Sequence, residues 1–293
     1  RGSRCFNLES SVRWFASFSR LSLNAEVRSV ARRTNPRLAA VVVGGGRGIG
    51  LGMARTLIEN TSNRVAVVTR EPSSPQCSGL QALQAKAGSR LIVLSGDPTD
   101  ETSLRQVALS LTTLQDEHDW TFRLLFNSSG MLHKQERKKG PEKSLQDFTG
   151  DWLIESIQAN TLAHVLPAKV LLPLFEKYKS LQKGLMKQDK DNYCPPVLAS
   201  ITGRVGSIED NQLGGWYSYR MAKAATNMAI KCMSIELARK NIAVLSLHPG
   251  TVATDLSAPF QKNVKPEKLF TVDYSCHRLL SICDEASMAD NGR

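Results

Sequence analysis

A strand pattern that breaks directly into a glycine loop constrains this chain more than any other feature. Residues 39–43 read Ala-Ala-Val-Val-Val, and residues 44–50 read Gly-Gly-Gly-Arg-Gly-Ile-Gly. Apolar residues at helical spacing follow and predict a helix over 48–59. A strand, a glycine turn and a helix in this order expose backbone N–H groups to an anionic ligand, with no Cβ in the way. The segment therefore predicts a phosphate-binding first unit of a parallel α/β sheet.

Short β-branched runs alternate with longer helical patterns along the rest of the chain. This alternation is typical of a parallel sheet with helices on both faces, because each parallel pair of strands needs a crossover. We predict one doubly wound α/β domain, a Rossmann fold, over residues 38–293. The predicted strands are 38–43, 64–69, 90–94, 122–127, 197–202 and 242–248. The clearest predicted helices are 48–59, 101–115, 151–179 and 219–239.

The net charge of +11 is concentrated ahead of the first predicted strand. Residues 1–37 hold eight arginines against two glutamates, which gives +6, and they also hold seven serines. A composition rich in arginine and serine and poor in acids is typical of an organellar transit segment. We expect residues 1–37 to be such an extension, directing the chain to the mitochondrial matrix rather than to a plastid. A disordered basic tail on a cytoplasmic protein is the alternative.

Composition argues against several other classes of protein. No apolar run approaches the roughly 20 residues that a membrane-spanning helix needs. The basic cluster at 134–143 contains no aromatic residues of the kind that stack on single-stranded nucleic acid, so no nucleic-acid partner is expected. The six cysteines form no Cys-x-x-Cys motif and have no histidine at metal-ligand spacing, so we expect free thiols and no metal site.

Tyr219 and Lys223 are the candidate reacting groups. Their spacing of four residues places a phenol and an ammonium on one face of the predicted helix. Hydride transfer from a nicotinamide to a carbonyl leaves charge on oxygen, so a proton donor must lie close to that oxygen. The ammonium stabilises phenolate and is expected to lower the pKa of the phenol. Tyr217 is a rival phenol, but the residue four positions after it is Met221.

The glycine loop and the Tyr–Lys pair together resemble the short-chain dehydrogenase/reductase family, classical type. The loop of that family is Thr-Gly-x-x-x-Gly-x-Gly, and here Val43 takes the place of the threonine. The resemblance runs from about Leu38 to Asp255. The long gap between Gly206 and Tyr219 is most similar to the C-factor/sniffer-like carbonyl reductase branch.

The resemblance implies an oxidoreductase that uses NADPH to reduce an aldehyde or ketone to an alcohol, with Tyr219 as proton donor. It also implies a short final strand, so we expect that the chain is cut short after Arg293. A non-catalytic NADP-binding sensor or scaffold of the same fold is the alternative. The intact pair of Tyr219 and Lys223 argues against that alternative.

Two arginines favour NADPH over NADH. An NADH site places a carboxylate after the second strand for the ribose 2′-hydroxyl, whereas the 2′-phosphate of NADPH needs a cation. Here Arg70 follows Thr69 at the strand end, and Arg47 lies inside the glycine loop. The resemblance adds contacts to the adenine, to the adenosine ribose and to the nicotinamide. The complete predicted cofactor site is Gly44, Arg47, Gly48, Ile49, Gly50, Arg70, Asp97, Asn127, Ser128, Ser129, Gly130, Tyr219, Lys223, Pro249, Gly250, Val252 and Thr254.

The resemblance also implies an asparagine and a serine near the tyrosine. Asn160 matches the asparagine, which in the family holds a water that connects the lysine to solvent. The serine, however, falls on Gly203 in this sequence. Thr202 is the predicted substitute, with Ser200 and Ser207 as other candidates. Because side chains alternate across a strand, Thr202 would face the tyrosine only if the backbone turns at the following glycine.

The remaining predictions concern surfaces rather than single residues. Residues 131–150 and 252–275 are expected to determine substrate specificity. The part after Thr251 either closes over a ligand or is a plain surface excursion. The resemblance implies a homodimer or homotetramer formed through the helices at 151–179 and 219–239.

Overall fold

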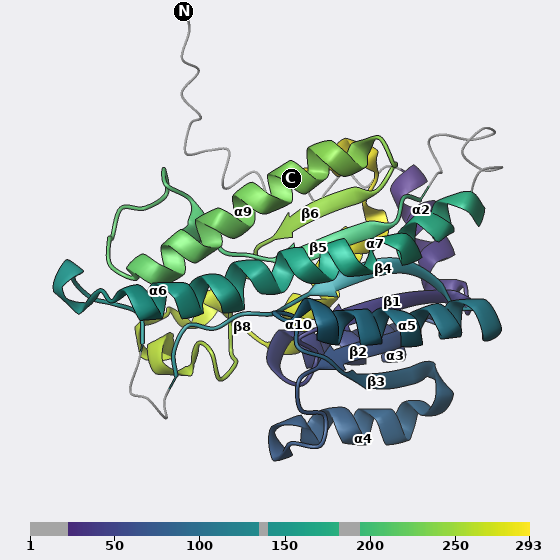
Figure 1. The fold of residues 1–293 in the computed structure, drawn as a ribbon, viewed down its shortest axis with the longest axis horizontal. Helices are drawn as coiled ribbons and strands as arrows, with labels where there is room; N and C mark the ends of the chain where they lie inside the picture. The colour runs from purple at the N-terminus through teal and green to yellow at the C-terminus, as the bar shows by residue number, and fades with distance from the viewer. Residues whose placement is uncertain (1–22, 135–139, 182–193) are drawn as a thin grey trace, which may run out of the picture.

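A six-stranded parallel sheet forms the centre of the computed structural model, which describes residues 23–134, 140–181 and 194–293 (Figure 1). The strand order is β3-β2-β1-β4-β5-β6. The strands are β1 (Leu38–Val43), β2 (Arg64–Thr69), β3 (Leu91–Ser95), β4 (Thr121–Asn127), β5 (Val197–Ile201) and β6 (Ala243–Leu247). The predicted doubly wound α/β domain is confirmed, and each strand lies within one residue of its predicted bounds.

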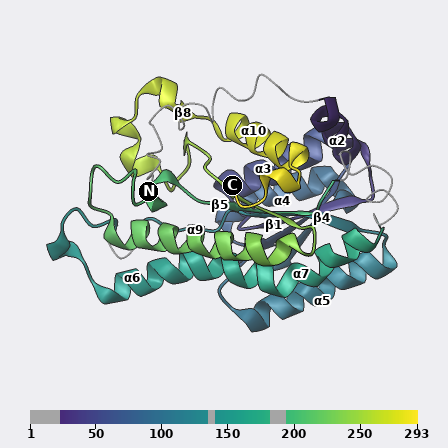
Figure 2. The same cartoon turned by 90° about the horizontal axis from the view of Figure 1, so that it is seen from above.

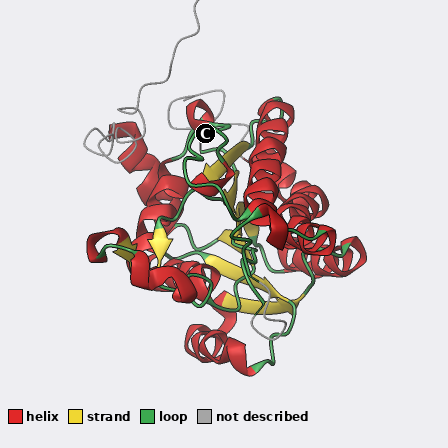
Figure 3. Cartoon of the chain, turned by 90° about the vertical axis from the view of Figure 1, so that its left-hand side faces the viewer, coloured by secondary structure: helices red, strands yellow, loops and turns green. Residues whose placement is uncertain are grey.

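Helices cover both faces of this sheet, as Figures 2 and 3 show. Side chains alternate along each strand, so that Ala40 and Val42 join one apolar core and Val41 and Val43 join the other. On the first face lie α3 (Gly48–Asn60), α4 (Ser78–Ala87) and α10 (Val272–Glu285). On the second lie α5 (Glu101–Glu117), α7 (Ala163–Leu181) and α9 (Tyr217–Ala238). Helices α4 and α10 were not predicted from the sequence.

The helix predicted over 151–179 is divided in the structure. It consists of α6 (Gly150–Ile157), a π-helical turn at Gln158–Leu162, and α7. A π turn locally widens the helix and is often found at functional sites. This one contains Asn160, which is completely buried.

The segment after residue 250 first forms a separate two-stranded sheet. A short strand β7 (Thr251–Val252) pairs with β8 (Leu269–Phe270), and two short 3₁₀ turns, Ala258–Asn263 and Pro266–Lys268, lie between them. Gly250 precedes β7 with φ +79°, and a Cβ there would lie 2.5 Å from the Phe270 ring. The close approach explains why this turn requires glycine.

A helix ahead of the first strand belongs to the packed domain. The predicted domain boundary lies at residue 38, whereas α2 (Leu23–Thr34) packs against α10. Arg32, which is 1 % exposed, donates to four carbonyl oxygens. The acceptors are Pro195, Cys283, Asp284 and Ala286. Because the last carbonyls of a helix have no intrahelical partner, this guanidinium caps the C-terminus of α10. The transit segment stays a prediction, and residues 1–22 lie outside the described ranges.

Asp284 joins three segments at the edge of the sheet where the strands begin. Its carboxylate is fully buried and accepts from Arg123 on β4 at 2.6 Å and from Arg33 on α2 at 2.8 Å. Arg123 also donates to Asn63, just before β2. The carboxylate therefore compensates buried positive charge from two elements.

The described ranges also show what the helices, potential metal ligands and cysteines do not form. There, no helix is long and apolar enough to cross a membrane, no three potential metal ligands gather, and the five cysteines form no disulfide. The sixth, Cys5, lies outside them. Met221, Met228 and Ile235 repeat every seven residues on α9 and are 40 %, 65 % and 64 % exposed. The homo-oligomer stays a prediction, and this apolar stripe lies on one of the two helices named for it.

We expect Asp284→Ala to lower the free energy of unfolding by about 3–5 kcal/mol, because it leaves the buried Arg123 without its carboxylate. Asp284→Asn retains an oxygen acceptor and should lose less. Glu59→Ala removes an exposed ion pair with Lys86 and should cost about 1 kcal/mol or less. Urea denaturation of the three variants checks this order. Equal losses would show that the buried cluster contributes no more to stability than the exposed ion pair does.

Candidate functional site

The glycine loop joins the end of β1 to the start of α3. Gly44 and Gly48 have φ values of +76° and +55°, which other residues rarely adopt. A Cβ at Gly50 would lie 2.3 Å from the Gly44 carbonyl oxygen. Arg47 is the N-cap of α3 and makes no side-chain hydrogen bond to the first turn. The loop therefore has the shape and the available N–H groups that a phosphate requires.

The end of β4 packs directly against this loop. The backbone N–H of Ser128 donates to the Val43 carbonyl at 3.0 Å, and a Cβ at Gly44 would lie 3.1 Å from the Ser129 nitrogen. Asn127 donates to the Ala163 carbonyl at 2.8 Å and accepts from the Ser129 N–H at 3.0 Å. The structure thus brings together the two predicted nucleotide motifs at the point where the strand order reverses.

The predicted cofactor cations are both exposed. Arg47 lies 3.1 Å from the Gln76 amide oxygen and 3.9 Å from the Asp255 carboxylate. Arg70 directly follows β2, and its carbonyl accepts from the Ser95 hydroxyl. Both guanidiniums therefore lie on segments at the carboxyl ends of neighbouring strands.

Asp97, predicted to meet the adenine, is engaged in a local turn. Its carboxylate accepts from the backbone N–H and the hydroxyl of Thr99 at 2.8 and 2.7 Å. Its own N–H donates to the Ser103 hydroxyl at 2.9 Å. These bonds fix the position of the carboxylate at the end of β3.

Gly250 lies between β6 and β7, and Thr254 follows β7 by two residues. A Cβ at Gly48 would lie 3.6 Å from the Thr254 methyl group, so this segment approaches the start of α3. Val252 is buried. The residues predicted to meet the nicotinamide, from Pro249 to Thr254, are therefore adjacent to the glycine loop.

Tyr219 and Lys223 lie in the first turns of α9. Lys223 is 2 % exposed, and its ammonium donates to the Ile201 carbonyl at the end of β5 at 3.2 Å. The ammonium lies 5.8 Å from the centre of the Tyr219 ring. Tyr219 itself is half-buried. The predicted pair is thus assembled at the carboxyl end of the sheet.

Burial controls the pKa values of this pair. It raises the pKa of Tyr219 to about 12 and lowers the pKa of Lys223 to about 8. We expected Lys223 to lower the pKa of the phenol, and in the structure the direction is the opposite. The physical reason is that desolvation of the phenol disfavours phenolate. At neutral pH Tyr219 is protonated, and most of Lys223 is charged.

Asn160 links the π turn to the segment after β4. Its amide nitrogen donates to the Met131 carbonyl at 2.8 Å, and its amide oxygen accepts from the Met131 N–H at 3.0 Å. Its backbone carbonyl accepts from the Thr226 hydroxyl at 2.6 Å. Thr226 follows Lys223 by three residues on α9, so these bonds join the two helices beside the lysine. Thr226 was not among the predicted site residues, although its spacing from Lys223 is a usable signal.

The position of the missing serine has room for a side chain. Gly203 has φ −166°, which any residue adopts, and a Cβ there would make only ordinary contact with Val205, at 3.4 Å. The Thr202 hydroxyl lies 3.0 Å from the Ser246 hydroxyl on β6. Within the described residues no hydrogen bond joins Thr202 to Tyr219. The role of Thr202 therefore stays a prediction, and its hydroxyl already has a partner.

His164 is a buried group near the site, and no sequence motif indicated it. It is 1 % exposed, and its Nε2 lies 2.9 Å from the Ser129 carbonyl. Burial, and then the charge of Lys223, lower the pKa of His164 to about 3. The imidazole is therefore neutral and donates from Nε2, which holds the Ser129 backbone in place.

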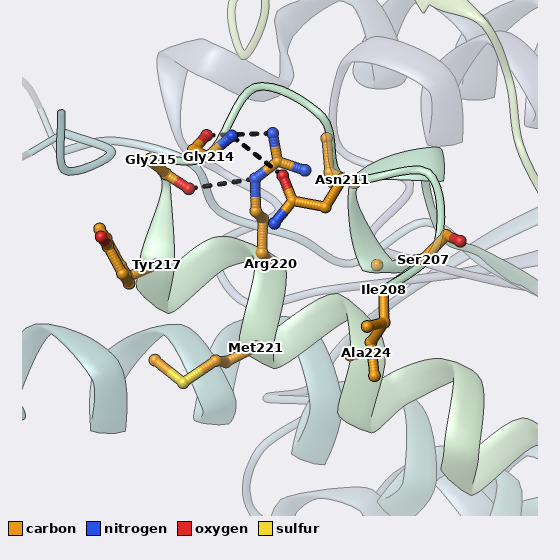
Figure 4. A pocket seen from close by; sticks show the side chains of 11 residues that line it. Ser207, Ile208, Asn211, Gly214, Gly215, Tyr217, Arg220, Met221 and Ala224 are labelled. Carbon is orange, nitrogen blue, oxygen red and sulfur yellow. Dashed lines mark hydrogen bonds between the residues drawn. The ribbon is translucent and has the colours of Figure 1, made fainter. Parts of the chain in front are cut away.

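A groove of about 390 Å³ lies beside the first of the two candidate phenols, Tyr217 (Figure 4). It lies between residues 205–215 and the first turns of α9, and Tyr217 and Met221 line it. Arg220 donates to the carbonyls of Gly215 and Gly214 at its rim. Tyr219 and Lys223 are not among the lining residues. Tyr217 therefore lies on a different side of the helix from the Tyr–Lys pair.

A family model described as "short chain dehydrogenase" matches residues 38–184 and 199–265. The chain belongs to this family of oxidoreductases. The resemblance inferred from the motifs is thereby confirmed over most of the sequence.

Solved structures and curated relatives agree with this assignment. The NADPH-bound carbonyl reductase from chicken fatty liver is 26 % identical, with a TM-score of 0.72, over 87 % of this chain and 94 % of that one. The carbonyl reductase Sniffer of D. melanogaster shares the fold, at 23 % identity and a TM-score of 0.71, with the same coverage. An uncharacterized oxidoreductase of Schizosaccharomyces pombe is 26 % identical over 86 % of this chain and 92 % of its own length.

Higher identity is confined to shorter stretches. The C-signal protein of Myxococcus xanthus is 47 % identical over 62 residues, which are 21 % of this chain and 37 % of that protein. The 1-hydroxy-2-glutathionyl-2-methyl-3-butene dehydrogenase of Rhodococcus sp. strain AD45 is 52 % identical over 60 residues, or 20 % of this chain and 26 % of that enzyme. These matches cover well under two thirds of either relative.

We expect stability to rise with pH through the titration of Lys223. The folded state loses this proton at about pH 8, whereas the unfolded chain keeps it to about 10.5. Between these values the unfolded state binds more protons, so the free energy of unfolding should increase by about 3 kcal/mol. The measurement is urea denaturation from pH 7 to 10.5, compared with Lys223→Met. An identical pH dependence in both proteins would show that Lys223 does not titrate in this window.

Proposed function

We propose that the chain is an NADPH-dependent carbonyl reductase that converts an aldehyde or ketone to an alcohol, with Tyr219 as proton donor. The observation that carries this proposal is the half-buried phenol, whose pKa burial raises to about 12, held beside the buried ammonium of Lys223. Carbonyl reduction requires a protonated donor next to the oxygen that gains charge. At neutral pH Tyr219 holds its proton, as a donor in carbonyl reduction must.

The nucleotide-binding features fit NADPH. The glycine cradle and the uncapped start of α3 suit a pyrophosphate, and the exposed Arg47 and Arg70 suit a 2′-phosphate. The similar carbonyl reductase from chicken fatty liver is described with NADPH bound. When bound, NADPH supplies the hydride for the reaction.

The other site residues support the proton transfer. Lys223 is mostly charged at neutral pH and stabilises the phenolate that remains after Tyr219 has given up its proton. Asn160 and Thr226 hold the two helices together next to the lysine. The protonated phenol is regained from solvent after the alcohol leaves.

A non-catalytic NADP-binding sensor is the second candidate. The observation in its favour is Gly203, which removes the hydroxyl that the family uses to orient the substrate carbonyl. The intact Tyr219 and the buried Lys223 favour the enzyme, because they place a proton donor and a cation side by side at the carboxyl end of the sheet.

Tyr219→Phe removes only the proton donor. We expect kcat for reduction of a panel of aldehydes and ketones to fall by about 100- to 10,000-fold, with the NADPH dissociation constant changed less than about threefold. The loss of NADPH absorbance measures the rate. Tyr217→Phe is the matched control and should keep nearly full activity, since Tyr217 lines a groove that neither Tyr219 nor Lys223 lines. NADPH binding without turnover that depends on Tyr219 would favour the sensor.

Gly203→Ser restores the missing hydroxyl at a position with room for it. We expect kcat/KM for carbonyl reduction to rise by about 10- to 100-fold, because a second donor then meets the developing charge on oxygen. Gly203→Ala adds the Cβ without the hydroxyl and should leave the rate near that of the wild type. If Thr202 already supplies the donor, Gly203→Ser will be neutral and Thr202→Val will lower kcat by a similar factor.

A further inference from the structure

Glu142 is a buried acid that the proposed reaction does not use. It is 3 % exposed and lies in the segment between β4 and α6, far from α9 in the sequence. Its carboxylate accepts from the Ser218 backbone N–H at 3.2 Å and also from the Ser218 hydroxyl. Burying a carboxylate is unfavourable unless charge-assisted bonds compensate it. Here the N–H and the dipole at the start of α9 supply that compensation.

The backbone of the same residue holds a second point on α9. The N–H of Trp216, the N-cap of the helix, donates to the Glu142 carbonyl at 2.6 Å. A Cβ at Gly215 would lie 3.2 Å from that carbonyl oxygen. Glu142 therefore contacts the residues on either side of Tyr217, at the point where the chain enters the catalytic helix.

The turn held by Glu142 is strained. Gly214, Gly215 and Trp216 have φ values of +65°, +61° and +54°. A left-handed tryptophan costs of order 1 kcal/mol or more, and such conformations persist only where the surroundings impose them. The result of this turn is that the Trp216 ring lies edge-on to the Tyr219 ring, at 6.2 Å. Glu142 thus acts on Tyr219 indirectly in two ways. It holds Ser218, the preceding residue in the chain, and it holds Trp216, whose ring packs on the Tyr219 ring.

We propose that Glu142 is a positioning residue for the proton donor: its two contacts fix the first turn of α9 and with it the Tyr219 hydroxyl. This inference rests on the proposed reductase function. A misplacement of about 1 Å at a reacting group can cost about 100-fold in rate. The residue acts on kcat, because it touches neither the glycine loop nor the predicted cofactor cations.

The test compares Glu142→Ala with Glu142→Gln in the full chain. We expect Glu142→Ala to lower kcat for aldehyde reduction by about 10- to 100-fold, with KM and the NADPH dissociation constant changed less than about threefold. Glu142→Gln retains an acceptor for Ser218 and should recover most of the rate. Asp210→Ala breaks an exposed ion pair with Arg204 in the neighbouring loop and should behave as wild type. Equal losses of kcat and NADPH affinity in Glu142→Ala would overturn the proposal.

A second arm separates positioning from general damage to the fold. In a Tyr219→Phe background, Glu142→Ala should have no further effect on the residual rate, because the group that it positions is gone. A further loss there would overturn the proposal.

Amide hydrogen exchange tests the clamp without turnover. Glu142→Ala should speed exchange of the Ser218 amide at least tenfold, and Glu142→Gln should do so much less. If the wild-type chain reduces no carbonyl compound, the proposed function fails while this arm still decides whether the clamp exists. Unchanged exchange in Glu142→Ala would overturn the clamp even in an active enzyme.

Discussion

The parallel pairing of β1 with β4 determines where the site lies. The register sets Val43 opposite Asn127, the last residues of the two strands. Each strand then continues into a motif of small residues, and the two motifs pack on each other. Because the strand order reverses between β1 and β4, the helices that follow them leave on opposite faces. The N-terminus of α3 and the π turn of Asn160 consequently approach the same end of the sheet from two sides.

Burial, more than the mutual attraction of the pair, sets the chemistry of Tyr219 and Lys223. The ammonium is desolvated against the end of β5, which brings its pKa to about 8, and the phenol is desolvated beside Trp216, which brings its pKa to about 12. Both shifts favour the neutral form of the group, although the pKa of Tyr219 rises and that of Lys223 falls. Tyr219 therefore carries its proton at neutral pH, as a donor in reduction must, whereas a base in oxidation would need the phenolate.

The parts of this structure that local sequence determines were predictable. All six strands and the helix after the glycine loop follow from β-branched runs, glycines and helical periodicity. The N-terminal helix α2 was not predictable in the same way, because its three arginines belong to residues 1–37, whose composition is typical of a transit segment. Its docking depends on Arg32 reaching the carbonyls at the end of α10, about 250 residues away. Packing of that kind leaves no local pattern.

The same distinction holds inside the site. Tyr219, Lys223 and Asn160 are recognisable because they occur in motifs, whereas Glu142 and His164 act through contacts with α9 and with Ser129 that no spacing reveals. The direction of the Tyr219 pKa shift was wrong for a related reason. The charge of Lys223 can be read from the sequence, but the desolvation that outweighs it depends on how the surrounding chain packs.

Without a serine at position 203, the rate of the proposed reaction depends more strongly on the position of the proton donor, Tyr219. With two donors, a substrate carbonyl is held from two directions, and a small displacement of either is tolerated. With Gly203 in that place, the proposed reaction depends more heavily on Tyr219 for both orientation and protonation of the oxygen. The rigidity of the first turn of α9 then becomes part of the chemistry. A buried carboxylate and a left-handed tryptophan, each unfavourable by itself, are understandable at this position as the means of keeping one phenol in place.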